Sequence, residues 1–122
     1  MSTILVVEDD QDLRNLLAII LDAEGYSVKE AEHGLEAWNI CLRTPLPDLI
    51  ILDIDMPVLD GWEFLDRRGR NPDLLAVPTL ICTATDARQR SQAYPGVQVL
   101  RKPFFAGQLV RMTQRALSKT TP

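Results

Sequence analysis

Five side chains that could carry out acid, metal-binding or nucleophilic chemistry occur at four separate places in the sequence. Glu8 and Asp9 form an acidic pair, Asp53 is a single carboxylate, Thr83 offers a hydroxyl and Lys102 an ammonium group. Each place follows a mainly apolar segment, directly or, for Lys102, after Arg101, which is typical of the end of a buried strand. A carboxylate can attack a phosphoryl donor, and a hydroxyl or ammonium group can stabilise charge on the transferred oxygens. The pattern predicts a site assembled at strand ends.

The three carboxylates of this set would repel one another if the fold brought them together. Crowding Glu8, Asp9 and Asp53 would raise the pKa of at least one of them unless a cation joined the group. The ligand atoms would all be oxygens, with no supporting His or Cys, so the residues favour Mg²⁺ or Mn²⁺ over zinc. Asp53 is the central candidate for a nucleophile that forms an acyl phosphate, and Lys102 and Thr83 are the candidates that would surround the transferred group.

Each of these residues also has an ordinary structural interpretation. A carboxylate at a strand end often caps the following helix, and Asp10 or Asp9 could do so here, with capping favoured for Asp10. A lysine at a strand end, such as Lys102, is often only solvated. The occurrence of acid pair, acid, hydroxyl and lysine at successive strand ends favours one shared site over separate structural roles.

Composition limits the class of protein. With 122 residues, 46% of them hydrophobic and 25% charged, the chain predicts one folded domain and excludes disorder for most of its length. A formal net charge of −4 disfavours binding to nucleic acid or to an anionic membrane surface. No apolar run approaches the roughly 18 residues needed to cross a bilayer, and the first residues lack a basic leader region, so we expect a cytoplasmic location.

The two cysteines predict no disulfide. Cys41 and Cys82 are far apart in the sequence, and each lies in an apolar stretch. Such positions are typical of reduced thiols in a hydrophobic core.

Strand and helix patterns alternate along the chain. Short apolar runs rich in β-branched residues predict strands, and apolar residues at spacings of three and four predict amphipathic helices. Five strands alternating with five helical patterns indicate a parallel sheet covered on both faces, with ligands bound at the carboxyl ends of the strands. The predicted strands cover residues 4–7, 26–31, 48–53, 77–82 and 97–100, and the predicted helices cover about 13–25, 34–42, 62–70, 86–93 and 105–117.

The periodicity also predicts which helix faces are buried. Arg14 falls on the polar side of the first helix, and the second helix is expected to bury Leu35, Trp38 and Leu42. Asn71-Pro72 is expected to close the third helix. The apolar side of the first helix consists of Leu13, Leu16, Leu17, Ile20 and Leu21.

Four short motifs surround the candidate residues. They are Val6-Val7-Glu8-Asp9, Asp53 followed by Met56-Pro57 and Gly61, Thr83-Ala84, and Lys102-Pro103-Phe104. Taken together, these motifs resemble the receiver domain of two-component response regulators, and the resemblance covers nearly the whole chain. It implies an α/β fold of flavodoxin-like type: a doubly wound, five-stranded parallel sheet with strand order 2-1-3-4-5. It also implies a single domain over residues 1–122, in which about 119–122 form a tail or the start of a linker.

The resemblance implies a phosphoacceptor signalling domain and not a metabolic enzyme. Asp53 would take a phosphoryl group from the phosphohistidine of a histidine kinase or histidine phosphotransfer protein, and would thereby switch binding to a downstream target that the sequence does not identify. The domain would catalyse only its own phosphorylation and slow autodephosphorylation. Asp9 and Asp53 would bind Mg²⁺ directly, with the backbone carbonyl of Asp55 as a further ligand and Glu8 acting through water.

In this family Thr83 would bond a phosphoryl oxygen and Lys102 would pair with the phosphoryl group, which biases a two-state equilibrium. The Lys102-Pro103 peptide is expected to be cis. Val99 stands where the family usually has an aromatic residue that moves inward on activation. Asp55 and Thr85 occupy the two positions that influence hydrolysis of the acyl phosphate.

The span between Thr83 and Lys102 is short, and Pro95-Gly96 interrupts it, so we expect a reduced fourth helix. Output through that helix would then be atypical for the family.

Two other functions fit parts of the sequence. The segment from Ile50 through Asp53 to Asp55 resembles the signature of haloacid dehalogenase phosphohydrolases, but that family needs a longer chain and an acidic motif after the lysine, and no acid follows Lys102. A receiver-like module that only docks to partners is the second alternative. The complete set of acids, threonine and lysine argues against it.

The remaining conspicuous side chains have ordinary interpretations. His33 is predicted to be solvated, and Trp62 either packs in the core or contacts a kinase near the first helix. The predicted third helix also carries a basic cluster, which is expected to form a solvated face. This cluster consists of Arg67, Arg68 and Arg70.

Overall fold

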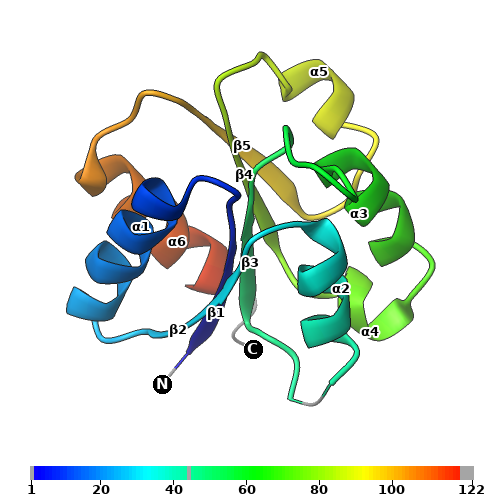
Figure 1. The fold of residues 1–122 in the computed structure, drawn as a ribbon, viewed down its shortest axis with the longest axis horizontal. Coiled ribbons are helices and arrows are strands. Elements are labelled where there is room, and N and C mark those ends of the chain that lie inside the picture. Colours follow the sequence, from blue (N-terminus) through cyan, green and yellow to red (C-terminus); the bar gives the residue numbers. More distant parts are fainter. Residues whose placement is uncertain (1, 44, 119–122) are drawn as a thin grey trace.

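The computed structural model describes residues 2–43 and 45–118, and the predicted tail at 119–122 lies outside this part of the chain. Strands and helices alternate from the first strand onward, with one extra helical turn between the third helix and the fourth strand (Figure 1). The strands are β1 (Thr3–Val7), β2 (Ser27–Ala31), β3 (Leu49–Leu52), β4 (Thr79–Thr83) and β5 (Val97–Arg101). The helices are α1 (Gln11–Ala23), α2 (Gly34–Cys41), α3 (Gly61–Arg68), α4 (Pro72–Leu75), α5 (Arg88–Ser91) and α6 (Ala106–Ser118).

All strand pairings in the sheet are parallel, and the strand order is β2-β1-β3-β4-β5. The predicted fold class and strand order are therefore confirmed. Helices α1 and α6 cover one face of the sheet, and α2, α3 and α4 cover the other (Figure 1). Because β3 consists of four aliphatic residues, it suits a central position with a helix layer on each side, and all four are buried.

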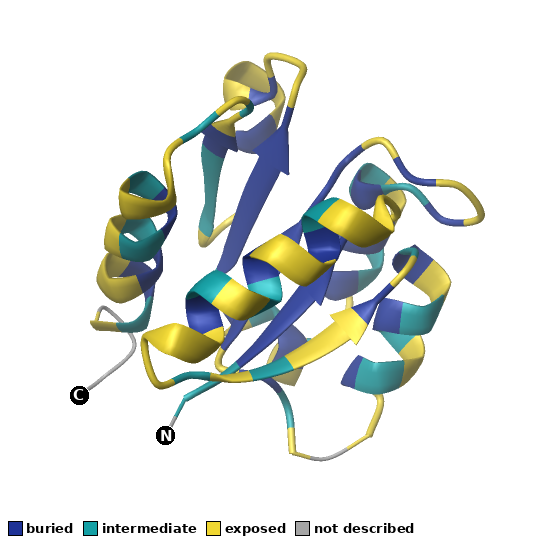
Figure 2. Ribbon diagram, turned by 60° about the vertical axis from the view of Figure 1, so that its left-hand side comes forward, coloured by how far each residue is buried: buried dark blue, intermediate teal, exposed yellow. Residues whose placement is uncertain are grey.

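Alternating side chains of the central strands feed two separate core layers. Ile4 and Val6 of β1 pack on the side of α1 and α6, whereas Leu5 and Val7 pack on the side of α2 and α3. Figure 2 shows the same division, with the central strands buried and the outer helix faces exposed. Cys41 and Cys82 are free and buried, as predicted, and burial raises the pKa of both thiols.

The predicted buried faces of the first two helices need correction. Arg14 is buried on α1, whereas Leu16 is 52% exposed. On α2 the buried residues are Gly34, Ala37 and Cys41, while Leu35 and Leu42 are exposed and Trp38 is half-buried. The cause is close packing at the start of α2, where a Cβ on Gly34 would overlap the backbone of Leu59. A helix that lies this close to its neighbours turns its small side chains inward, although periodicity favours the large ones.

The region between the third helix and β5 also differs from the prediction. The third helix ends earlier than predicted, at Arg68 with Gly69 as its C-cap, and not at Asn71-Pro72. Asn71 instead caps an unpredicted turn, α4, with Pro72 at its first position. The fourth predicted helix is reduced further than expected, from about two turns to the four residues of α5. Arg68, predicted to be solvated, is only 1% exposed. Its Nε and Nη2 donate to the Val77 carbonyl at 3.3 and 2.9 Å, which fixes the entry to β4.

Candidate functional site

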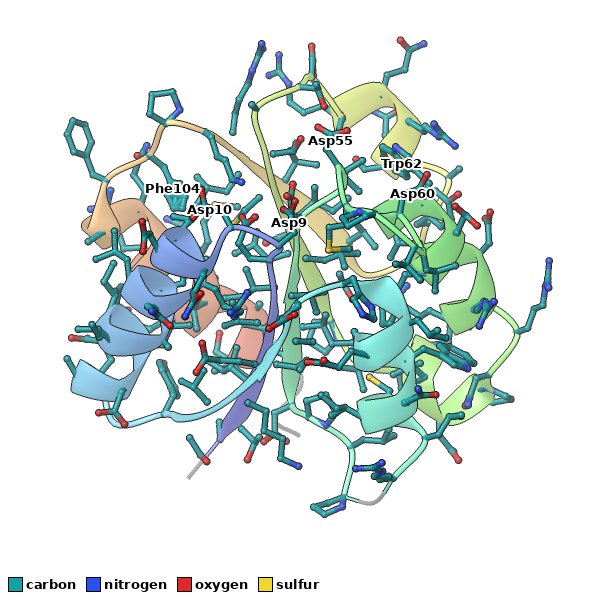
Figure 3. The ribbon with its side chains drawn as sticks, in the orientation of Figure 1. Asp9, Asp10, Asp55, Asp60, Trp62 and Phe104 are labelled. Atoms are coloured by element: carbon teal, nitrogen blue, oxygen red, sulfur yellow. The ribbon has the colours of Figure 1, made fainter. Side chains whose placement is uncertain are left out.

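The carboxyl ends of β1 and β3 bring three acidic side chains together. Val7 is in register with Leu52, and the amide of Asp53 donates to the carbonyl of Val7 at 3.0 Å, so the residues that follow each strand are neighbours. Glu8, Asp9 and Asp53 each offer a carboxylate oxygen, and these oxygens all lie within 4.8 Å of one another. Asp9 and Asp55 lie at this end of the sheet in Figure 3. The predicted convergence of the acids at strand ends is thus present.

This acidic cluster has the chemistry of a divalent cation site. Glu8 and Asp53 are buried, at 3% and 6% exposure, whereas Asp9 faces solvent. Two buried carboxylates beside a third carry a repulsion that a cation would remove. The donors are all oxygens, which suits a hard ion such as Mg²⁺ that keeps several water ligands on its open side. The Asp55 carboxylate, which is exposed, does not belong to the cluster.

The pKa of the Asp53 carboxyl is strongly raised in the protein without metal. Its burial raises the pKa to about 7 from the ordinary 3.8, and the charge of Glu8 and a hydrogen bond with it act in the same direction. Lys102 and the amide of Asp55 lower the pKa of Asp53 but do not offset the burial. A perturbed carboxyl at a strand end is typical of a functional group.

Lys102 reaches the site from the end of β5. Its Nζ donates to Glu8 Oε1 at 2.8 Å and lies 3.8 Å from Asp53 Oδ1. Burial by itself would lower the pKa of Lys102, but the hydrogen bond to Glu8 and the charge of Asp53 raise it above the ordinary value. The ammonium group is therefore charged and close to Asp53. The Lys102-Pro103 peptide is cis, as the resemblance implied.

The sequence predicted Thr83 as the first residue after the fourth strand, but in the structure it is the last residue of β4. Its side chain is fully buried, and the Lys102 amide donates to its carbonyl at 2.8 Å, which ties the ends of β4 and β5 together. The Thr83 hydroxyl oxygen lies 3.0 Å from the hydroxyl oxygen of Thr85 and accepts a hydrogen bond from the Thr85 amide at 3.2 Å. Thr85 is thus a direct partner of Thr83.

The loop after β3 is shaped by two unusual backbone features. A Cβ on Gly61 would lie 2.6 Å from Ile54 Cδ1 and 2.8 Å from the Asp53 carbonyl oxygen, so only glycine fits there. Val58 adopts a φ of 71°, which costs energy for a β-branched residue. The Asp55 amide donates to Asp53 Oδ1 at 3.4 Å. The loop therefore packs against the carbonyl of Asp53 and contacts its carboxylate.

In the loop after β1, Asp10 caps the following helix and Asp9 belongs to the acidic cluster. Asp10 is the N-cap of α1, and its side chain accepts from the Leu13 amide at 3.1 Å, as favoured from the sequence. The cap leaves Asp9 available to the acidic cluster. Arg14, which the sequence analysis placed on the polar side, donates through Nη1 to the Glu8 carbonyl at 2.8 Å. It also lies 3.5 Å from Glu30, so it fixes the end of β1 from the neighbouring strand.

Other residues singled out from the sequence lie away from the cluster. Val99 packs half-buried against the core layer beneath α3. His33 caps α2 by accepting from the Glu36 amide at 3.1 Å and is half-buried, not fully solvated. Trp62 is half-buried, packs on the same core layer and stacks on Tyr94, which agrees with the core interpretation.

Sequence comparison gives a family for this architecture. A family model described as response regulator receiver domain matches residues 4–114. The chain is 37% identical to response regulator MprA of Mycolicibacterium vanbaalenii over 98% of its length, and that alignment covers 52% of the relative. It is 35% identical to a 14.6 kDa uncharacterised protein of Leptolyngbya boryana, with 92% of this chain and 87% of that protein covered. The chain spans about half the length of the MprA relatives.

Solved structures agree with this result. Chemotaxis protein CheY4 of Vibrio cholerae superposes with a TM-score of 0.88 at 30% identity, covering 96% of this chain and 99% of that one. NtrX of Brucella abortus superposes with a TM-score of 0.84 at 29% identity, but the match covers only 27% of NtrX. Within the described residues, no helix is both long and apolar enough to span a membrane.

Proposed function

The chain belongs to the response regulator receiver domain family of two-component systems, and on that premise we propose that Asp53 accepts a phosphoryl group from phosphohistidine. The donor would be a histidine kinase or a histidine phosphotransfer protein. The observation that carries the proposal is the buried Asp53 carboxylate, grouped with Glu8 and Asp9 and 3.8 Å from the Lys102 ammonium. This arrangement offers a nucleophile, a cation site and a fixed positive charge within one small volume.

The transfer forms one bond and breaks one. A carboxylate oxygen of Asp53 bonds to phosphorus while the P–N bond of phosphohistidine breaks, and the bonding electron pair passes to the imidazole nitrogen. A bound Mg²⁺, held by Asp9, Asp53 and the Asp55 carbonyl, and by Glu8 through water, would supply positive charge near the transferred oxygens. Lys102 neutralises charge from the side of β5.

The phosphorylated state would be read by the ends of β4 and β5. Thr83 would turn its hydroxyl to a phosphoryl oxygen, and Lys102 would exchange part of its bond with Glu8 for one with the phosphoryl group. Each exchange favours a second arrangement of the loops, which is how a phosphoryl group biases a two-state element. Val99 stands where the family usually has an aromatic side chain, so the side chain that would move on activation is smaller here.

The chain would act as a signalling domain that promotes only its own phosphorylation and slow dephosphorylation. Asp55 and Thr85 would set the lifetime of the acyl phosphate. Asp55 lies two residues after Asp53 and Thr85 two residues after Thr83, so both would lie beside the phosphoryl group. We further propose a cytoplasmic location, since two buried free thiols suit a reducing compartment. The downstream partner would be a protein, without direct contact to nucleic acid or membrane.

Intact mass spectrometry tests the phosphoacceptor directly. The protein is incubated with Mg²⁺ and acetyl phosphate or phosphoramidate, beside Asp53→Asn and a sample with EDTA. We expect a gain of about 80 Da that requires both Asp53 and Mg²⁺. A gain that persists in Asp53→Asn would assign another acceptor. No gain in a folded wild-type protein that also fails to bind beryllofluoride would instead support a docking module.

A further inference from the structure

Arg14 is a buried arginine beside the acidic cluster, and the proposed phosphoryl transfer does not use it. It lies on α1, about one turn after the N-cap Asp10, and is only 7% exposed. All three nitrogens of its guanidinium group have partners. Nη1 donates to the Glu8 carbonyl at 2.8 Å, and the other two form ion pairs. A buried charge with a full set of partners holds its neighbours in a defined arrangement.

The ion pairs of Arg14 come from the edge strand β2 and the turn after it. Arg14 Nε lies 3.5 Å from Glu30 Oε1, and Nη2 lies 3.9 Å from Glu32 Oε1. Both carboxylates are partly exposed, at 42% and 66%, so the pairs contribute little to stability by themselves. They still offset the charge of the guanidinium group and hold its planar fork in one orientation.

The hydrogen bond to Glu8 extends the β1 ladder with a side chain. Val7 is in register with Ala31, where β2 ends, and the Glu8 amide donates to the Ala31 carbonyl at 3.1 Å. The Glu8 carbonyl lies beyond this last strand hydrogen bond and accepts from Arg14. The backbone of Glu8 is therefore held at its amide and at its carbonyl, although the strand has ended.

Arg14 also holds the backbone on the other side of Asp9. The Arg14 amide donates to the Asp10 carbonyl at 2.9 Å, while its side chain binds the Glu8 carbonyl. In Figure 3, Asp10 lies at the start of α1 and Asp9 at the end of the sheet. One residue thus fixes the backbone immediately before and immediately after Asp9, which is the exposed member of the acidic cluster.

We propose that Arg14 is a positioning residue for divalent cation binding at the acidic cluster. It acts through the Glu8 carbonyl, which sets the direction in which Glu8 and Asp9 leave the end of β1. Metal ligands are oriented by the groups that support them, and loss of such a support costs about 10- to 100-fold in metal affinity. The inference deepens the proposed function and rests on it, because it assumes that the cluster binds Mg²⁺.

The sign of the expected effect separates positioning from simple electrostatics. Arg14 carries a positive charge near the cluster, and a role through charge alone would make it repel the ion. Removal of Arg14 would then tighten Mg²⁺ binding. In a positioning role, removal loosens the backbone around Asp9 and weakens Mg²⁺ binding instead. The ion pairs with Glu30 and Glu32 offset the charge of Arg14, so we expect the geometric effect to be the larger.

Arg68 provides a matched control at the opposite edge of the sheet. It is also a buried arginine that donates to a backbone carbonyl next to a strand, but its partner Val77 precedes β4. The acidic cluster instead follows the carboxyl ends of β1 and β3, and the strands are parallel. Replacement of either arginine removes a buried guanidinium group. Of the two, Arg14 contacts a residue of the cluster, whereas Arg68 donates to Val77 and Leu75.

Calorimetric Mg²⁺ titration compares the wild type with Arg14→Met, Arg14→Lys and the control Arg68→Lys. Arg14→Lys keeps the charge but lacks the planar fork, and it serves as the second variant if Arg14→Met fails to fold. Circular dichroism verifies that each variant is folded. A purely structural role would lower the Tm but leave the Mg²⁺ affinity of the folded protein unchanged. NMR relaxation in EDTA measures the order parameter of the Asp9 amide without any metal.

We expect Arg14→Met to bind Mg²⁺ about tenfold more weakly and Arg14→Lys at least about threefold more weakly, with Arg68→Lys equal to the wild type. The order parameter of Asp9 should fall in the two Arg14 variants and not in Arg68→Lys. Unchanged or tighter Mg²⁺ binding in both Arg14 variants would overturn the positioning role, and so would an equal loss in Arg68→Lys. A wild-type protein that binds no Mg²⁺ would instead overturn the cation site of the proposed function, and the positioning role with it.

Discussion

Lys102 Nζ lies 2.8 Å from Glu8 Oε1 but 3.8 Å from Asp53 Oδ1, so the lysine donates a hydrogen bond to Glu8 and only forms a longer ion pair with Asp53. In the proposed function this arrangement keeps a positive charge close to Asp53 without a direct hydrogen bond from the lysine to the reacting carboxylate. Glu8 therefore has two functions, as the hydrogen-bond partner of Lys102 and as a member of the acidic cluster.

Glu8→Gln should separate these two functions. Loss of the Glu8 charge removes one cause of the high pKa of Asp53, so this pKa should fall below about 7. Mg²⁺ affinity should drop by about tenfold, because a group that orients the ion is lost. NMR titration of the carboxyl groups and calorimetric Mg²⁺ titration check the two effects. An unchanged pKa of Asp53 would contradict the coupling between the two carboxyls.

Asp53→Asn should change how the stability of the metal-free protein depends on pH. The folded state keeps the Asp53 proton up to about pH 7, whereas the unfolded chain releases it near the ordinary pKa of 3.8. Ionisation of Asp53 therefore lowers the free energy of unfolding as pH rises through this window. Asparagine stays neutral, so the variant should equal the wild type near pH 4 and exceed it in Tm above pH 7.

Thermal melts in EDTA across this range measure that difference, and repeats with Mg²⁺ provide the control. The ion should raise the Tm of the wild type and have little effect on Asp53→Asn. A difference in Tm that stays constant from pH 4 to pH 8 would show that Asp53 titrates normally.

Lys102→Ala should bind Mg²⁺ but respond poorly to a phosphoryl group. The carboxylates of the cluster remain, yet the ammonium that pairs with the transferred oxygens is gone. A charged hydrogen bond contributes about 1.5–3 kcal/mol, so the affinity for beryllofluoride should fall by about 10- to 150-fold. Titration calorimetry measures both ligands. Equal affinity for beryllofluoride would remove Lys102 from the switch.

Thr85→Ala should favour the switched state. The Thr83 and Thr85 hydroxyl oxygens lie 3.0 Å apart, so Thr83 must give up a partner before it can bond a phosphoryl oxygen. One neutral hydrogen bond contributes about 0.5–1.5 kcal/mol, which predicts about two- to tenfold tighter binding of beryllofluoride. Thr85→Ser keeps the hydroxyl and should behave as the wild type. Identical binding by all three proteins would exclude this competition.

Gly61→Ala should damage the site through the backbone. The added Cβ meets the Asp53 carbonyl, so a loss of about 1–3 kcal/mol in stability and weaker Mg²⁺ binding are expected. Gly107→Ala is the matched control, because nothing lies within 4 Å of its Cβ and it sits in α6. Denaturant unfolding should show the control unchanged or slightly more stable.

The convergence of the site was predictable because parallel strands end at one edge of a sheet. Apolar runs located the strands, and the polar residues after them gave Glu8, Asp9, Asp53 and Lys102 without knowledge of packing. The buried faces of α2 were not predictable in this way. They depend on how closely Gly34 approaches the loop at Leu59, which is a property of the assembled layers.

Two arginines that were predicted to be solvated are buried in the structure. Periodicity assigns a charged residue to the solvent side, but Arg14 and Arg68 instead donate to backbone carbonyls at the ends of strands. Their partners are distant or irregular segments, and no local pattern reveals them. The single turn of α4 was missed for a related reason: it is too short to show a helical period.

The stacking of Trp62 gives the molecule its own optical reporter. Trp62 of α3 lies 5.8 Å from the ring of Tyr94 and beneath the guanidinium of Arg90, so its surroundings combine α3 with α5 and the turn after it. The second tryptophan, Trp38, packs against Phe64 and has no such contact with α5. Any displacement of α5 relative to α3 therefore changes the emission of one indole and leaves the other as an internal reference.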